Sequence, residues 1–238
     1  MRPFLSFPLF SFAYGVAGFG FPPFPYYESS LNGFPDPQIP LLTELPEAQD
    51  CSSLDILFLY DITSSMGDSF RSAKAVSGRL LEDIPEIYQD VRFAVATVGD
   101  FPSKNTPDDT PYFLVSSFRT DSTVSFLSLE SLVLYGGGDV EESYPYALRS
   151  ASNEDWRPEA KRFVVLFADS RARNFEQLQE SVQHSNFTLF ALISDASYLF
   201  YWEQVTPHTF PLPSTDEDYK AILQAIEKEC HVDYASLP

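Results

Sequence analysis

Hydrophobic residues in this chain gather in short uninterrupted runs. Leu54–Tyr60 is mostly large and apolar, contains no turn former, and breaks abruptly into DITSSMGD, which predicts a buried strand ending in a polar loop. Similar runs predict further strands at Val91–Val98, Tyr112–Phe118, Phe163–Ala168 and Phe187–Ile193, and a short edge strand at Thr209–Leu212.

Between these runs, apolar residues recur every three or four positions, as on one face of a helix. Ala73, Val76, Leu80 and Ile84 have this spacing and predict a helix over Met66–Ile84, which Pro85 should end. We expect further helices at Val124–Leu134, Tyr144–Ser150, Asn174–His184 with Asn174 as its N-cap, Ser197–Val205 and Asp216–Cys230. The alternation predicts an α/β fold with a doubly wound, mostly parallel sheet and helices on both faces.

The first 50 residues have a different composition. They hold nine of the nineteen prolines, eight phenylalanines and one cation, Arg2. Residues 1–18 loosely imitate a secretory signal, whereas the alternative is an extended, proline-stiffened arm. Both readings stay open, and both leave a domain at 51–230 followed by a short tail at 231–238.

The charge balance limits the classes of partner. With 34 acidic and 15 basic residues among 238, the net charge is −19. A nucleic-acid backbone would be repelled, so we expect no nucleic-acid partner, and cations are favoured. No apolar stretch reaches the roughly 18 residues of a spanning helix, so we expect no transmembrane span.

The two cysteines, Cys51 and Cys230, stand at opposite ends of the predicted domain. Metal-binding cysteines lie closer together, so we interpret the pair as one disulfide. A disulfide would imply an oxidising compartment and hence an extracellular or secreted protein. The alternative is two buried free thiols in a cytosolic protein.

Polar residues follow two of the predicted strands directly. Asp61, Thr63 and Ser65 come after the first strand, and Asp169 comes after Phe163–Ala168. Ligands of open α/β sheets bind outside the carboxyl ends of the strands, and a spacing of two lets alternate side chains point the same way. We expect the GGGDVEES turn at 136–143 to lie beside them.

These side chains are hard oxygen donors without histidine or thiolate, which suits Mg²⁺, Mn²⁺ or Ca²⁺ better than zinc or copper. Protein sites rarely fill all six positions around Mg²⁺, so an acidic side chain of a partner could take a vacant one.

The motifs D-x-T-x-S at 61–65 and G-G-G-D-x-x-E at 136–142, and the aspartate that ends an apolar strand at 169, resemble the von Willebrand factor A domain. The similarity covers roughly Cys51–Cys230, and DITSSMGD, VRFAVATVGDF and FTLFALIS look most like the I-like domain of integrin β subunits. The resemblance implies a Rossmann-like fold and a metal-ion-dependent adhesion site, with Mg²⁺ or Mn²⁺ held by Asp61, Thr63, Ser65, Glu142 and Asp169. If all three carboxylates of this set coordinated directly, their charges would repel an incoming carboxylate, so we expect at least one of them to act through water.

The same resemblance implies flanking cation sites, including one for Ca²⁺, to which Asp68, Asp100 and Asp139 would contribute. The sequence departs from the integrin β pattern at Ser69, where a carboxylate is expected, and at Gly137, where an asparagine is expected. It also lacks the cysteine loop of integrin β subunits, since Ser103–Tyr112 contains no cysteine.

Other readings of these residues remain. Thr63 and Ser65 are typical helix caps, and Glu142 could be a solvated acid in a first helical turn. The leading function is a non-catalytic adhesion module that captures an Asp or Glu of a protein partner. The alternatives are an assembly subunit that uses the aromatic arm at Phe19–Tyr27, and a haloacid-dehalogenase-like phosphotransferase, although Thr63 stands where that enzyme class has a second aspartate.

Overall fold

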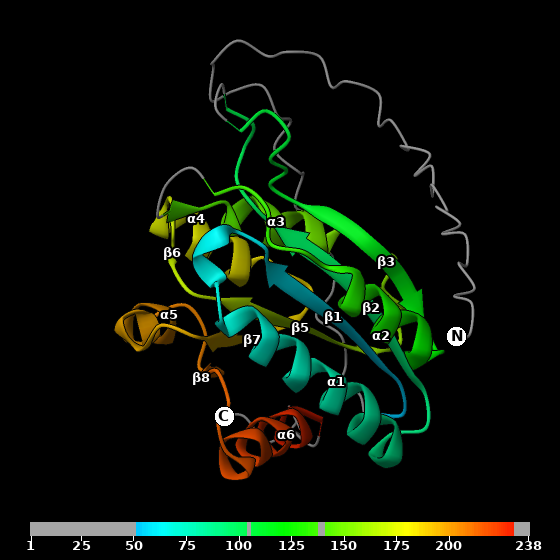
Figure 1. Ribbon diagram of the computed structural model, residues 1–238. Coiled ribbons are helices and arrows are strands. Elements are labelled where there is room, and N and C mark those ends of the chain that lie inside the picture. The colour runs from blue at the N-terminus through cyan, green and yellow to red at the C-terminus, as the bar shows by residue number, and fades with distance from the viewer. Residues whose placement is uncertain (1–50, 104–105, 138–140, 231–238) are drawn as a thin grey trace, which may run out of the picture. The chain divides into compact units, whose positions relative to one another are not determined.

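A computed structural model describes residues 51–103, 106–137 and 141–230 (Figure 1). The predicted arm at 1–50, its signal-like segment and the tail at 231–238 lie outside the described residues. A six-stranded sheet has the order β3-β2-β1-β5-β7-β8. Its strands are β1 (Leu54–Asp61), β2 (Val91–Val98), β3 (Phe113–Arg119), β5 (Lys161–Ala168), β7 (Thr188–Ile193) and β8 (Thr209–Pro211). The predicted α/β fold with a mostly parallel sheet is confirmed, and β3 alone in this sheet runs antiparallel to its neighbour.

Helices cover both faces of the sheet (Figure 1). Side chains alternate along β1, so Ile56 and Phe58 face one core while Leu57 and Leu59 face the other. The first core packs against α1 (Ser69–Ile87), α2 (Ser122–Ser131) and α6 (Asp216–Cys230). The second packs against α3 (Tyr144–Ser152), α4 (Phe175–Gln183) and α5 (Leu199–Glu203).

Several predicted helix boundaries were wrong. Helix α2 covers Ser122–Ser131 and not Val124–Leu134, and α5 covers only Leu199–Glu203 of the predicted Ser197–Val205. Pro85 lies inside α1 and does not end it, because a proline in the last turn removes only one backbone hydrogen bond. The same helix begins at Ser69 and not at Met66, since Ser64–Met66 forms a separate 3-10 turn (η1) before Gly67, whose φ is +39°. Asn174 does cap α4, because its side chain accepts a hydrogen bond from the Gln177 backbone at 3.0 Å.

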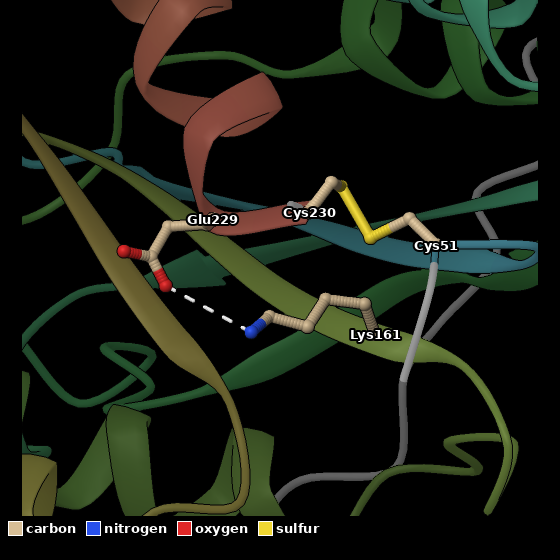
Figure 2. The surroundings of a disulfide bond; sticks show 4 residues. All are labelled: Cys51, Lys161, Glu229 and Cys230. Atoms are coloured by element: carbon tan, nitrogen blue, oxygen red, sulfur yellow. Dashed lines mark ion pairs between the residues drawn. A yellow bond between two sulfur atoms is a disulfide. The ribbon is translucent and has the colours of Figure 1, made fainter. Parts of the chain in front are cut away.

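The predicted disulfide joins Cys51 to Cys230, whose Cα atoms lie 5.1 Å apart (Figure 2). It ties the segment before β1 to the last residue of α6. Beside it, Glu229 forms an ion pair with Lys161 at 3.8 Å, and its carboxylate lies 3.1 Å from His208 Nε2. The alternative of two free thiols is therefore wrong.

A buried ion-pair network lies at the amino ends of the central strands. The Asp55 carboxylate is fully buried and accepts hydrogen bonds from Arg92 Nη2 at 2.6 Å and Arg157 Nε at 3.0 Å. Arg157 also pairs with the half-exposed Asp90 at 2.6 Å. Burial alone would raise the pKa of Asp55, but the hydrogen bonds from both arginines outweigh it and lower that pKa. The network links β1, β2 and the segment before β5.

Among the described residues, no helix combines the length and the apolar character that crossing a bilayer requires.

Candidate functional site

The candidate site lies where β1 and β5 end side by side. Asp61 is the last residue of β1, and Asp169 directly follows β5, which pairs with β1 in parallel. Burial raises the pKa of Asp61 most, and the negative charge of the nearby Asp169 adds to this rise. Neighbouring parallel strands therefore bring together two carboxylates that are far apart in the sequence, as predicted.

Hydrogen bonds hold the first loop in one conformation. Asp61 Oδ1 accepts from the Thr63 backbone N–H at 2.9 Å and from the Thr63 hydroxyl at 2.5 Å. That hydroxyl lies 3.0 Å from the Ser65 hydroxyl. Thr63 precedes η1 but makes no side-chain capping bond, so capping does not explain this residue. The Thr63 hydroxyl instead lies between the Asp61 carboxylate and the Ser65 hydroxyl and contacts both.

The second loop brings Glu142 to the same place through a feature that the sequence did not predict. Strand β4 (Glu141–Glu142) forms a short parallel ladder with β6 (Arg171–Ala172), which follows Asp169. The Arg173 backbone N–H adds a bond of 3.1 Å to the Glu142 carbonyl. Glu142 is thus a strand residue with 1% exposure, and its interpretation as a solvated acid in a helical turn was wrong.

The three carboxylates lie in an unfavourable electrostatic environment. Burial raises the pKa of Asp61 to about 6, although hydrogen bonds from Thr63 and Tyr144 lower it. Burial and the negative charges of Asp61 and Asp100 raise the pKa of Glu142 to about 9, although a hydrogen bond with Thr63 lowers it. Burial also raises the pKa of Asp169, although a hydrogen bond with Ser65 lowers it. Glu142 Oε2 and Asp169 Oδ1 are buried and have no hydrogen-bond partner within the described residues.

The residues predicted for flanking sites lie in different surroundings. Asp68 is exposed at the start of α1, on the wall of a groove that Ser194 and Asp216 also line. Asp100 is buried and pairs with Arg173 Nη2 at 2.8 Å, so a guanidinium group already contacts it. Asp139 lies outside the described residues.

Glycines allow the second loop to approach the first. Gly136 and Gly137 have φ angles of +74° and +88°, which side chains disfavour. The Gly136 carbonyl accepts from the Ser64 hydroxyl at 2.8 Å, and a Cβ at position 137 would lie 3.1 Å from the Thr63 Cβ. The glycines therefore permit close contact between the first and second loops.

Gly136→Ala should destabilise the domain by about 1–2 kcal/mol from the left-handed backbone alone, and more from a clash. The added Cβ would lie 1.9 Å from Oδ1 of the buried Asp109. Urea unfolding measures the change. The matched control is Gly78→Ala in α1, where the new Cβ would make an ordinary contact of 3.7 Å with Phe126 and should stabilise by roughly 0.5–1 kcal/mol. Equal effects of the two substitutions would contradict the role given to Gly136.

Two buried residues at the site were missed in the sequence. Tyr144, the first residue of α3, donates a hydrogen bond to Asp61 Oδ2 and lies 2.9 Å from the Ser170 hydroxyl. Trp202 Nε1 donates to the Ser170 carbonyl at 2.9 Å. Nothing in the sequence distinguishes Tyr144 from an ordinary core aromatic, because its role depends on contacts with distant segments.

Comparison with known proteins gives a consistent picture. The family model of the von Willebrand factor type A domain matches residues 55–229. A search of curated proteins found no match. Among solved structures, a conserved hypothetical protein BatB from Bacteroides thetaiotaomicron aligns with a TM-score of 0.59 at 13% identity, covering 76% of this chain and 100% of that one.

An aerotolerance-related membrane protein from Bacteroides fragilis, carrying multiple mutations to serine, aligns with a TM-score of 0.56 at 14% identity. The alignment covers 74% of this chain and 100% of that one. At such identities the two structures show a shared fold.

Proposed function

Because the chain belongs to the von Willebrand factor type A domain family, whose members generally act as protein-interaction modules, we propose that it binds a protein partner through a divalent cation. The cation lies among Asp61, Thr63, Ser65, Glu142 and Asp169, and an Asp or Glu of the partner completes its coordination. In this respect the domain works like the I-like domain of integrin β subunits.

The unpaired carboxylate oxygens carry this proposal. Leaving a buried acceptor without a partner costs about 1–3 kcal/mol or more when it is charged, yet Glu142 Oε2 and Asp169 Oδ1 are both in that state. A divalent cation supplies the missing partner and favours the ionised form of the neighbouring acids. The donor set therefore fits a hard cation such as Mg²⁺ or Mn²⁺.

The hydroxyl groups contribute the neutral donors of the proposed site. The Thr63 hydroxyl donates its proton to Asp61, which leaves its lone pairs for the cation. No group of three or more acidic, histidine or cysteine side chains within residues 51–103, 106–137 and 141–230 forms a metal cluster by itself. The site accordingly relies on Thr63 and Ser65, and at least one carboxylate acts through water, so an incoming acid is not repelled.

The cation supplies positive charge that attracts and orients the partner's carboxylate. The protein fixes the geometry of its own oxygens through the strand ends and the glycine turn. The disulfide agrees with an oxidising compartment, so we place the domain outside the cytosol. We infer no catalytic step, because binding alone accounts for the donor set.

Glu142→Gln should weaken Mn²⁺ and Mg²⁺ binding by about 10- to 100-fold while the fold persists, since it removes one charged ligand and keeps the side-chain volume. Isothermal titration calorimetry with the metal alone measures the affinity. Glu141→Gln is the matched control, because Glu141 is the adjacent acid and pairs with Arg171 at 2.9 Å on the exposed side. Equal metal affinity in Glu142→Gln and the parent would refute the ligand assignment.

The partner is tested separately, by recovering bound proteins from the native surroundings in Mg²⁺ and in EDTA. A protein retained in Mg²⁺, released by EDTA and absent with Glu142→Gln supports the adhesion role. A protein that is retained equally in EDTA and with Glu142→Gln contradicts the adhesion role.

A further inference from the structure

Tyr144 connects all three loops of the candidate site. It stands two residues after Glu142 in the sequence and is fully buried. Its hydroxyl donates to Asp61 Oδ2 in the first loop. Since a carboxylate can only accept, the same oxygen accepts from the Ser170 hydroxyl, 2.9 Å away and next to Asp169. One phenol thus links the chain segments that carry Asp61, Glu142 and Asp169.

Packing fixes the phenol in this position. The Trp202 ring packs edge-on against Tyr144, with the ring centroids 5.2 Å apart and the planes at 70°. Trp202 is itself fully buried and anchored by its bond to the Ser170 carbonyl. The ring therefore cannot turn away without losing its packing against Trp202 and breaking two buried hydrogen bonds, so the core and these bonds together fix the position of its hydroxyl.

The hydrogen bond controls how Asp61 faces the site. Oδ1 of Asp61 accepts from the Thr63 backbone and hydroxyl, and Oδ2 accepts from Tyr144. These three donors at both oxygens fix the plane of the carboxylate. Because Asp61 takes the Thr63 proton, the plane of Asp61 also sets the direction of the Thr63 lone pairs. Losing the Tyr144 bond would free the carboxylate to rotate and would disorder a proposed ligand.

We propose that Tyr144 is a positioning residue for the cation, acting through Asp61 and, by way of Ser170, on the loop that carries Asp169. The inference rests on the proposed function. It goes beyond the ligand set, since Tyr144 makes no contact with the ion and sets the arrangement of groups that do. Outer partners of metal ligands change metal affinity by about 10- to 100-fold when they are removed.

The competing interpretation is that the hydroxyl of Tyr144 only stabilises the fold, and Tyr60 offers a matched comparison. Tyr60 is also fully buried on β1, one residue before Asp61, but faces the opposite core. Its hydroxyl bonds to Ser77 and to the Ala73 carbonyl in α1. Tyr60→Phe therefore removes a buried tyrosine hydroxyl from the same sheet without touching a proposed ligand.

The experiment measures Mn²⁺ affinity by calorimetry and thermal unfolding in EDTA for the parent, Tyr144→Phe, Tyr60→Phe, Ser170→Ala and the Tyr144→Phe/Ser170→Ala double variant. We expect Tyr144→Phe to weaken Mn²⁺ binding about 10-fold or more and Tyr60→Phe to leave it unchanged, although both lower the melting temperature. Ser170→Ala should weaken binding less, and the double variant should match Tyr144→Phe, because Tyr144→Phe already removes the Tyr144–Ser170 hydrogen bond.

The outcomes separate the inference from the function on which it rests. Parent affinity in a folded Tyr144→Phe, or equal weakening by Tyr60→Phe, overturns the positioning role while the cation site stands. A parent that binds no Mn²⁺ removes the proposed function and this inference with it. Should Tyr144→Phe fail to fold, Ser170→Ala decides: it supports the inference if Mn²⁺ binding weakens and contradicts it if binding is unchanged.

Discussion

Replacing Asp55 with asparagine is expected to lower the free energy of unfolding by about 3–5 kcal/mol, the usual cost of removing one partner from a buried ion pair. The change leaves Arg92 and Arg157, each with 18% side-chain exposure, without the carboxylate that neutralises them. Asparagine preserves the side-chain volume, so the decrease in unfolding free energy measures the removal of the charge and not the creation of a cavity. Urea unfolding measures the effect, which should also lower the melting temperature by roughly 2–4 °C per kcal/mol.

Asp90→Asn provides the control for this prediction. Asp90 pairs with the same Arg157, but its side chain is 51% exposed, and surface ion pairs contribute about 0–1 kcal/mol. The expected difference between the two substitutions arises from burial. Equal losses for Asp55→Asn and Asp90→Asn would contradict the network as described.

The pH dependence of stability checks the same group. The folded-state pKa of Asp55 is lowered from its ordinary value of 3.8. Its stabilisation is therefore complete above that value and is lost as the pH falls through the lower, folded-state pKa. The stability difference between the parent and Asp55→Asn should be constant near neutral pH and shrink below about pH 4. A difference that grows under acid would reverse the sign and refute the assignment.

Reducing the Cys51–Cys230 bond should lower the free energy of unfolding by as much as about 5 kcal/mol on the chain-entropy model, because it opens a very long loop in the unfolded chain. The separation of 179 residues spans the described domain from its first residue to its last. Chemical unfolding with and without reductant measures the change. The Cys51→Ala/Cys230→Ala variant should match the reduced parent and be insensitive to reductant.

A thiol assay on the native protein gives an independent check of the bond. Two titratable thiols without any reductant would contradict it. Metal affinity should change little on reduction as long as the domain stays folded, since the bond lies at the amino ends of the strands, away from Asp61 and Asp169.

The strands could be predicted because they are long, buried runs. β1 and β2 differ from their predicted ranges by at most one residue, and helix α6 has the predicted range. The β4–β6 ladder could not be predicted, since two residues per strand give no periodic pattern. The antiparallel direction of β3 could not be predicted either. The direction of a strand depends on the segment that connects it to its neighbour, and the apolar residues of the strand itself do not reveal it.

Some residues of the candidate site could likewise be predicted from the sequence, and others could not. Asp61, Thr63 and Asp169 could be singled out because each lies at or just after a strand end, and parallel strands bring such ends together. Tyr144 and Arg173 could not, because their roles come from contacts with segments more than 70 residues away. Whether Asp68 and Asp139 hold further ions stays a prediction. Asp100 already binds Arg173 through Oδ1.

The disulfide has a mechanical consequence. Cys51 and Cys230 are the first and last described residues, and their Cα atoms are 5.1 Å apart. A pulling force applied to the chain on either side of these two residues passes through the sulfur atoms and bypasses the sheet. Under tension of this kind the sheet and the loops at its far edge carry no load, and they keep their shape until the S–S bond is broken.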